Sequence, residues 1–348
     1  MTDDLVFDAA TRLFADLSTE AVINQAEAGT WPAALWDAVA EAGFCDAVAG
    51  DDAFALAGFA DAGAILRAAG RHAVPLPLAE TMLARHWLAG AGLAAPPGPL
   101  SVAPVEPGEH LAIAVARGGC RVSGTAAGVP WARDAAAIVV IASGYVALVP
   151  AASAVVKPGA SLAGEPRDDV GFDVVVSDGA AAPVPTLHDA GQLFGLGAAC
   201  RAAQMAGAME SVLELSVQYA NDRVQFGRPL AKFQAIQHQL ALLAEQVAAA
   251  RVAADAACAT IAARGADASF AIAAAKIRAG EAAGKVTDYA HQVHGAIGFT
   301  HEHRLHHLTR RLWAWRDEFG TESQWSAELG RRIAARGAEA MWPTITAE

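Results

Sequence analysis

The spacing of apolar residues divides the chain into three parts. In residues 1–97 apolar side chains recur every three or four positions, as in PAALWDAVAEAGF, where Leu35 and Val39 share one face and Gly43 ends the segment. This spacing is typical of amphipathic helices. It predicts an N-terminal helical domain over residues 1–97, which ends in the Pro- and Gly-rich stretch LAAPPGPL.

Residues 98–185 contain short apolar segments separated by turn residues. The uncharged stretch AAAIVVIASGYVALVPAASAVV is long enough to cross a bilayer, but Ser143, Gly144 and Pro150 divide it into two short segments that we interpret as buried strands. Several short strands in succession predict a middle β domain over residues 98–185, a small antiparallel sheet or barrel.

Residues 186–348 return to helical spacing. Two stripes recur at steps of three and four, one of Met205, Met209, Val212, Ser216 and Tyr219, the other of Ile236, Leu240, Leu243 and Val247. Such stripes are typical of the seams of a bundle of long helices. We therefore predict a C-terminal four-helix bundle over residues 186–348, in a protein that is mainly α with a β middle domain.

Charge and cysteine content exclude several classes of function. The formal net charge is −12, which argues against a non-specific nucleic-acid binder. The four cysteines lie far apart and lack metal-binding spacing. The N-terminal MTDDLVFDAATRLF is acidic and lacks the basic-then-apolar order of a signal peptide. We expect a cytoplasmic protein that binds neither nucleic acid nor membrane.

One segment between two predicted helices, NDRVQFGRPLAKFQAIQHQLA, combines residues suited to ligand binding. Gly, Pro and Phe are explained by a simple helix break with a packed turn. The cluster of Arg223, Gln225, Gln234 and Gln237 is not, because a guanidinium suits a phosphate and a glutamine amide suits a ribose or an adenine edge. The residues alone leave both interpretations open.

A second segment, QVHGAIGFTHEH, has Gln292 at the end of a predicted helix, and Gly295 and Gly298 in a tight loop. Backbone amides of such a loop can donate to phosphates, although a plain glycine helix end is the alternative. The nearby HEHRLHH is not HExxH, because Leu305 replaces the second histidine, and we predict no metal site. GLGAAC is not a dinucleotide-binding GxGxxG, since Cys200 replaces the last glycine.

Together these two segments resemble the acyl-CoA dehydrogenase family. YANDRVQFGRPLAKFQAIQHQLA is similar to the family pattern of Tyr, Arg, Gln-Phe-Gly, Pro, and then Phe-Gln with a later Gln. QVHGAIGFTHEH is similar to the family's Gln-x-x-Gly-Gly-x-Gly loop, with Ala296 at the second glycine. The resemblance is strongest over residues 195–325, and the family has the same order of helical, β and helical domains.

The resemblance implies an oxidoreductase of lipid metabolism that acts on CH–CH groups. Its reaction would be the α,β-desaturation of an acyl-CoA thioester, with FAD as the cofactor. In the family a base removes the α-proton while the β-hydrogen leaves as hydride to the flavin. A dimer-of-dimers assembly is also implied, a homotetramer or a heterotetramer. The FAD-binding residues that the resemblance implies, often facing the cofactor of a neighbouring subunit, are Arg223, Gln225, Phe226, Gln234, Gln292, Gly295, Ala296 and Thr321.

The sequence departs from the family at the catalytic base. Most members carry a glutamate in a Tyr-Glu-Gly-Thr segment, whose counterpart here is EFGT, so that Phe319 occupies the base position and Glu318 precedes it. A minority places the base on the helix before Arg223, at a position that falls at about Gly197 here. Because phenylalanine and glycine cannot take a proton, Glu318 is the remaining candidate.

Two further departures concern the substrate side. The middle domain lacks the family's Gly-Ser-Asp stretch, although the resemblance implies that Trp131 lies near the flavin. A substrate-holding arginine of the family is replaced near Ala198, with Arg201 close by. Some members of the family are heterotetramers, often in steroid degradation, in which a shorter subunit lacks the base and completes the FAD site of its partner. This chain resembles such a subunit.

We therefore expect an acyl-CoA dehydrogenase chain that acts as the non-catalytic subunit of a heteromeric enzyme. Its expected partners are an acyl-CoA and either a second copy of itself or a longer homologous subunit. The alternatives are a flavin-dependent monooxygenase or oxidase of the same fold, and a scaffold subunit without enzymatic activity.

Overall fold

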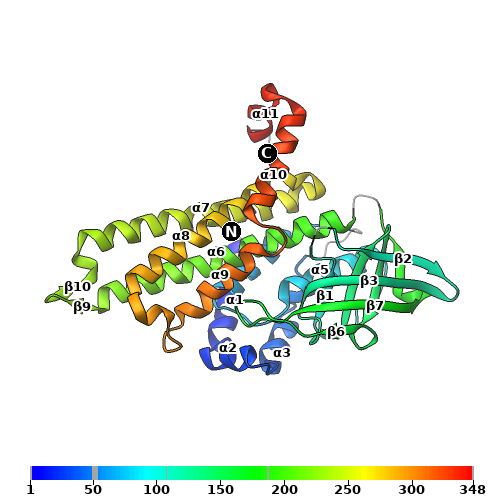
Figure 1. Ribbon diagram of the computed structural model, residues 1–348, viewed down its shortest axis with the longest axis horizontal. Helices are drawn as coiled ribbons and strands as arrows, with labels where there is room; N and C mark the ends of the chain where they lie inside the picture. The colour runs from blue at the N-terminus through cyan, green and yellow to red at the C-terminus, as the bar shows by residue number, and fades with distance from the viewer. Residues whose placement is uncertain (1, 49–53, 107, 186–187, 347–348) are drawn as a thin grey trace.

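The structure is a computed structural model that describes residues 2–48, 54–106, 108–185 and 188–346 (Figure 1). Its N-terminal part is helical, as predicted. The helices are α1 (Thr2–Leu17), α2 (Glu20–Glu27), α3 (Ala33–Glu41), α4 (Phe59–Arg71) and α5 (Leu78–Gly90). On α3 the predicted face, Leu35 and Val39, is buried, and the chain leaves the helix through Gly43 in the left-handed conformation.

The middle of the chain forms two four-stranded sheets, ordered β1-β4-β5-β8 and β2-β3-β7-β6. The strands are β1 (Leu100–Ala103), β2 (Leu111–Ala116), β3 (Gly119–Pro130), β4 (Ala137–Ala142), β5 (Tyr145–Pro150), β6 (Val155–Lys157), β7 (Arg167–Ser177) and β8 (Ala181–Pro183). Side chains of both sheets, among them Val122, Val140 and Phe172, share one buried core.

The uncharged stretch is a strand pair, as predicted. It forms the antiparallel strands β4 and β5, joined by Ser143 and Gly144, which both have positive φ as two-residue hairpin turns require. Among the described residues, no helix combines the length and the apolar character needed to cross a membrane. One pairing differs from a purely antiparallel sheet, because β1 lies parallel to β4. Residue alternation does not specify strand direction, since either direction puts the same side chains on each face.

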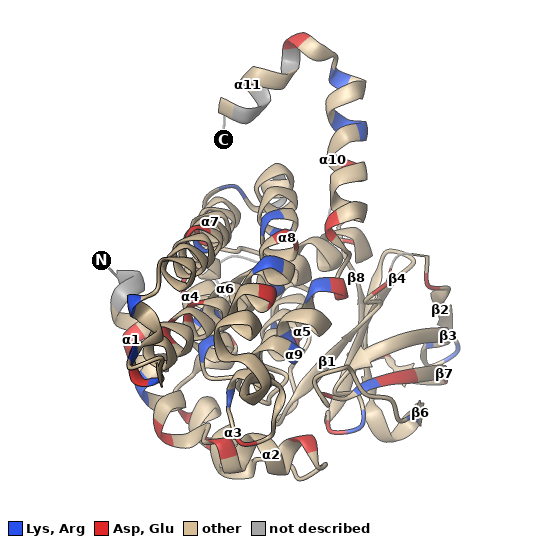
Figure 2. Ribbon diagram, turned by 60° about the vertical axis from the view of Figure 1, so that its left-hand side comes forward, with Lys and Arg blue, Asp and Glu red and all other residues tan. Residues whose placement is uncertain are grey.

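The C-terminal part is a helical bundle with a projecting arm. Its helices are α6 (Ala190–Asp222), α7 (Gln234–Arg264), α8 (Ser269–His294), α9 (Leu305–Asp317), α10 (Glu322–Arg336) and α11 (Met341–Thr346). Figure 2 shows α10 and α11 extending away from the body. The predicted stripes are buried at Met205, Met209, Val212, Ser216, Leu243 and Val247, whereas Tyr219, Ile236 and Leu240 are only half-buried.

Helix α6 is the central element of the fold, because it contacts α4, α5, α7, α8 and α9. The contact with α4 is so close that a Cβ added at Gly207 would collide with the backbone of Arg67. One end of α6 lies near the β domain, and the other reaches the far tip of the molecule (Figure 1). The predicted order of helices, β domain and helical bundle is confirmed, while the limits 1–97, 98–185 and 186–348 remain predictions.

Candidate functional site

The connection between α6 and α7 is a small hairpin at the tip of the bundle (Figure 1). Strands β9 (Val224–Gln225) and β10 (Arg228–Pro229) pair in antiparallel fashion. The two turn residues, Phe226 and Gly227, both have positive φ, 52° and 80°. Glycine adopts this conformation readily, whereas phenylalanine is strained in it. A strained residue at such a position is a mark of a functional surface.

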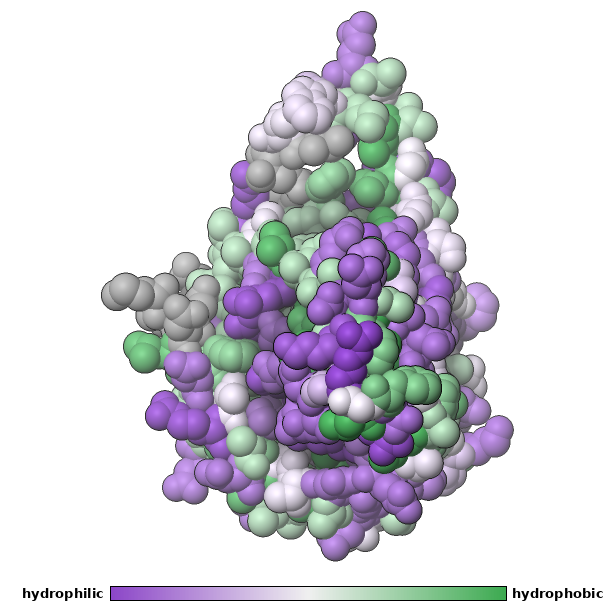
Figure 3. Space-filling model, turned by 90° about the vertical axis from the view of Figure 1, so that its left-hand side faces the viewer, coloured by the Kyte–Doolittle hydropathy of each residue, from purple (hydrophilic) through white to green (hydrophobic). Residues whose placement is uncertain are grey.

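The predicted binding residues of the hairpin are exposed. Arg223, Gln225 and Gln234 are accessible, and the ring of Phe226 is 93% exposed. Within the described part of the chain Arg223 has no ion-pair partner, while the Arg228 guanidinium lies 4.1 Å from the centre of the Phe233 ring. Figure 3 shows the molecule from this end, where apolar side chains reach the surface between polar ones. Arg223 therefore keeps its charge without an acidic partner among the described residues, and most of the Phe226 surface faces solvent.

The second predicted segment lies at the same end of the bundle. Gln292 is exposed near the end of α8, Gly295 ends the helix with a φ of 64°, and Ala296 is exposed beside it. The ring of Tyr219, four residues before Arg223, stacks on His294 with 4.6 Å between ring centres. This stack links the end of α6 to the end of α8, so the structure brings the two motifs together.

Thr321 lies apart from these residues. Its hydroxyl accepts from the backbone N–H of Gln324, and the Gln324 side chain accepts from the backbone N–H of Thr321, a capping box that starts α10. Thr321 belongs to the same segment as Glu318 and Phe319, on the β-domain side of the bundle.

Glu318 is held between two arginines. One carboxylate oxygen accepts from Arg201 Nε at 2.6 Å, and the other from Arg167 Nε at 2.8 Å. Burial alone would raise the pKa of Glu318, but the charges and hydrogen bonds of Arg167 and Arg201 hold it below the usual value. A carboxylate paired in this way is a weak proton acceptor, so the geometry favours a structural role for Glu318.

Phe319 fills space beside α6. Its backbone has a φ of 52°, and its ring is buried. A Cβ added at Gly197 would overlap the Phe319 ring, so the ring lies directly against that glycine. Phe194 packs at 6.2 Å between ring centres, and the Arg201 guanidinium lies 5.6 Å from the centre of the Phe319 ring. Phe319 and Gly197, the two positions that the sequence resemblance aligns with the family's base, are thus in contact, and neither has an acidic side chain.

Lys276 fixes the turn that carries these residues. Its buried ammonium group donates to the carbonyl oxygens of Arg316 and Gly320, both at 2.6 Å, and to that of Trp315 at 3.3 Å. Burial lowers the pKa of Lys276 to about 8. A cation at the C-terminal end of α9 also interacts favourably with the helix dipole.

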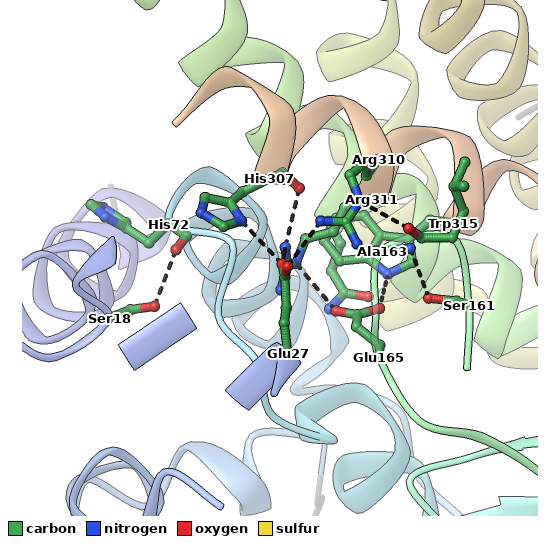
Figure 4. Close-up of polar contacts among 12 residues, drawn as sticks. Ser18, Glu27, His72, Ser161, Ala163, Glu165, His307, Arg310, Arg311 and Trp315 are labelled. Carbon is green, nitrogen blue, oxygen red and sulfur yellow. Dashed lines mark hydrogen bonds and ion pairs between the residues drawn. The ribbon is translucent and has the colours of Figure 1, made fainter. Parts of the chain in front are cut away.

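The pair with Glu318 belongs to a larger buried network that sequence analysis missed. Arg201 also pairs with Glu80 of α5, and Arg167 pairs with Glu165 at 3.2 Å. Glu165 in turn contacts Arg311 of α9 at 3.3 Å, and Arg311 contacts Glu27 of α2 at 3.0 Å. Figure 4 shows the last part of this chain of contacts. Its members are far apart in sequence, so only the folded chain reveals the network.

Trp131 is buried in the β domain, with its ring 6.2 Å from that of Trp31. Both rings line a cavity of about 320 Å³ together with Arg133, Asp134 and Gly164. Among the described residues, no cluster of three or more His, Cys, Asp or Glu side chains is arranged to hold a metal ion.

The two parts of the candidate site are well separated. Arg201 and Arg223 are joined by continuous helix, which puts them about 33 Å apart at the rise of an α-helix. Glu318 and Phe319 lie beside Arg201, whereas the hairpin lies at Arg223. The exposed residues of the hairpin and the packed contact between Phe319 and Gly197 therefore lie in different parts of the chain.

Comparison with known proteins agrees with this fold. Residues 187–333 match the model of the acyl-CoA dehydrogenase C-terminal domain. The chain is 38% identical over 120 residues, 34% of its length, to acyl-CoA dehydrogenase IpdE2 of Mycolicibacterium smegmatis. That match spans only 37% of the relative.

Two solved structures superpose on nearly the whole chain. The ChsE4-ChsE5 complex from Mycobacterium tuberculosis has a TM-score of 0.84 at 23% identity, over 95% of this chain and 97% of that chain. The steroid ACAD Tcur3481-Tcur3483, a G363A variant, has a TM-score of 0.84 at 25% identity. The superposition covers 96% of this chain and 98% of that chain. With its C-terminal helices matching the family model and its three parts arranged in the family's fold, the chain belongs to the acyl-CoA dehydrogenase family, whose members typically depend on FAD.

Proposed function

We propose that this chain is the non-catalytic subunit of a heteromeric, FAD-dependent acyl-CoA dehydrogenase. In this proposal its hairpin holds the adenosine and pyrophosphate half of an FAD whose flavin ring lies in a longer partner subunit. The observation that carries the proposal is the packing of Phe319 against Gly197, which fills the place of the base with an apolar ring.

The residues shown in contact with the Phe319 ring, which are Gly197, Phe194 and Arg201, do not suit proton abstraction from an acyl-CoA. Glu318 is the carboxylate next to Phe319 in the chain, but it accepts hydrogen bonds from Arg167 and Arg201. Removing its charge would leave the buried guanidinium groups of Arg201 and Arg167 with only Glu80 and Glu165 as acidic partners, at a cost of several kcal/mol. Glu318 is therefore proposed to be a structural residue, and the base to come from the partner subunit.

The hairpin residues fit the phosphate and adenosine groups of FAD. The Arg223 guanidinium would pair with the pyrophosphate, and the exposed Phe226 ring would cover an apolar face of the cofactor. The amides of Gln225, Gln234 and Gln292 and the backbone N–H groups of Gly295 and Ala296 would hydrogen-bond the remaining polar atoms. FAD bound there would supply the hydride acceptor of the desaturation.

The distance along α6 supports a shared site. Because the hairpin lies about 33 Å from the Glu318 segment, a cofactor held by Arg223 has its flavin ring near another subunit. Val217, Val224, Leu242 and Phe299 are 40% to 67% exposed near this tip, an apolar surface suited to a partner. Thr321, which caps α10 on the other side, is not included in this proposed FAD site.

The decisive experiment expresses the chain alone and together with its longer homologue. We expect the chain alone to retain no FAD and to show no acyl-CoA-dependent dye reduction, and the complex to be yellow and active. A steroid acyl-CoA is the first substrate to test, given the likeness to a steroid acyl-CoA dehydrogenase. Rapid desaturation by the chain alone, with stoichiometric FAD, would overturn the proposal. Reductase-dependent oxygen consumption would favour the monooxygenase alternative instead.

A further inference from the structure

The cavity of about 320 Å³ beside Trp131 has no role in the proposed dehydrogenase function. It lies where the connection between α2 and α3 meets the β domain, and the β domain is at the opposite end of the molecule from the β9–β10 hairpin (Figure 1). In the proposed function the flavin ring lies in the partner subunit, which gives Trp131 no task there. The side chains around the cavity define which ligand it suits.

Two tryptophan rings form an aromatic corner of this cavity. Trp31 and Trp131 both line it, with 6.2 Å between ring centres and an angle of 80° between ring planes. The buried Trp36 packs against Trp31 at 5.8 Å between ring centres and holds that ring in place. Trp31 itself is half-buried, so part of its surface is accessible. Because the face of an indole ring carries negative potential, such a corner attracts cations.

Hydrogen bonds fix the backbone around the aromatic corner. The backbone N–H of Trp131 donates to the carbonyl oxygen of Pro166 at 3.1 Å, and Arg310 Nε donates to that of Leu162 at 2.9 Å. Pro166 and Gly164, which belong to the same loop as Leu162, line the cavity. Walls that are already in place before binding reduce the entropic cost of ordering a ligand site.

Asp134 brings a negative charge to the cavity wall. It is half-buried, and its carboxylate forms no ion pair within the described part of the chain. Its oxygen atoms are not sealed inside the protein, so a ligand can reach them. Burial raises the pKa of Asp134, which means that the fold pays a cost to keep this carboxylate charged. A cation bound beside it would offset that cost.

The other charged side chains of the cavity are already balanced. Arg133 also lines it, but its Nε donates to the buried carboxylate of Asp168 at 2.9 Å. Glu27 belongs to the buried network of Figure 4, in which equal numbers of carboxylates and guanidinium groups pair with one another: Glu27, Glu80, Glu165 and Glu318 with Arg167, Arg201, Arg310 and Arg311. The charge of Asp134 is therefore the uncompensated one among the described residues that line the cavity.

We infer that this cavity binds a small quaternary ammonium compound. The Trp31 and Trp131 rings contact its methyl groups, and the Asp134 carboxylate balances its charge. An ammonium ion with N–H groups would need several hydrogen-bond acceptors, whereas Asp134 is the one uncommitted carboxylate among the described lining residues. A quaternary ammonium donates no hydrogen bonds, so aromatic faces and a single carboxylate suffice to hold it.

Titration calorimetry of the full-length chain with choline chloride tests this inference. Choline is expected to bind saturably, and 3,3-dimethyl-1-butanol, which has the same shape without the charge, at least about tenfold more weakly. Asp134→Asn and Trp31→Leu should each weaken choline binding about tenfold. The matched controls are Asp178→Asn and Trp342→Leu, which change exposed residues that do not line the cavity, and both should bind choline normally.

Proton NMR of choline gives an independent measurement, because indole faces shield the N-methyl protons and should move their resonance upfield on binding. The comparison of choline with its uncharged analogue uses the unaltered chain, so it stands even if Trp31→Leu fails to fold. Absence of saturable binding, equal binding of the two compounds, unchanged affinity in Asp134→Asn, or displacement of choline by riboflavin would overturn the inference. None of these measurements involves acyl-CoA or a partner subunit, so their failure would not bear on the proposed dehydrogenase role.

Discussion

The ring of Phe319 lies against the backbone of Gly197, so closely that a single methyl group added to that glycine would overlap the ring. Phe319 follows α9 and Gly197 lies within α6, and they are the two positions that the sequence resemblance aligns with the catalytic base of family members. The contact fills the space between these two positions with apolar packing.

Gly197→Ala should destabilise the chain by about 2 kcal/mol, because the added methyl group overpacks a closed core. Urea unfolding measures the change. The double variant Gly197→Ala/Phe319→Ala should lose about 1 kcal/mol less unfolding free energy than the two single variants lose in total. The reason is that alanine at 319 makes room for the methyl group at 197.

The matched control is Gly330→Ala in α10, where an added Cβ meets no atom within 4 Å. This change should leave stability equal or slightly higher, because alanine favours helix. Strict additivity of Gly197→Ala and Phe319→Ala would contradict the contact.

Glu318→Gln should lower stability by about 3 kcal/mol, because two buried arginines lose the charge they share. The activity of the assembled heteromeric enzyme should be unchanged, since the base is proposed to lie in the partner. Chemical denaturation and dye reduction are measured on the same preparation. Glu328→Gln, whose partners Arg331 and Arg332 are exposed on α10, serves as the control and should change stability little. Activity loss at full stability would instead identify Glu318 as a base.

Arg223→Ala should leave the stability of the chain unchanged, because the side chain is exposed. The assembled complex should nevertheless retain FAD at least about tenfold more weakly, the loss expected for one charge-assisted contact to a phosphate. Absorbance of the bound flavin after dialysis measures retention. Arg121→Ala, an exposed arginine of β3 paired with Asp173, tests for a general effect of removing positive charge and should retain FAD normally.

Stability should decrease in acid in two stages. Burial lowers the pKa of His86, of His72 and of His294 to about 4. Between pH 6.5 and 4 the unfolded chain therefore binds more protons than the folded chain, and stability falls as the pH falls through this range. His86, which is 3% exposed, contributes up to roughly 3 kcal/mol.

A second decrease should follow below pH 4.5, because Glu27 has its pKa lowered to about 2 and its ion pairs are lost as it is protonated. Thermal unfolding from pH 7 to pH 3 measures both stages. His86→Gln should flatten the first stage and Glu27→Gln the second. An unchanged slope between pH 6.5 and 4 in His86→Gln would show that His86 is not neutral when buried.

Much of the fold follows from local pattern. The stripe of Met205, Met209 and Val212 predicted the seam of α6, because helical spacing puts every third or fourth side chain on one face. The turn at Ser143 and Gly144 likewise predicted the strand pair β4 and β5. The break between helices around Phe226 was predicted from its Gly and Pro residues, whereas the β9–β10 hairpin that it forms was not.

The rest depended on contacts between distant segments. The sequence by itself determined the order of helices and strands and the presence of phenylalanine at 319 and glycine at 197, the positions that the resemblance aligns with the family's base. Only the tertiary structure decided that Phe319 closes over Gly197, that Glu318 is committed to Arg201 and Arg167, and that β1 lies parallel to β4. The periodicity of apolar residues indicates which face of a helix or strand is buried. Which side chains that face contacts depends on how elements far apart in the chain pack together.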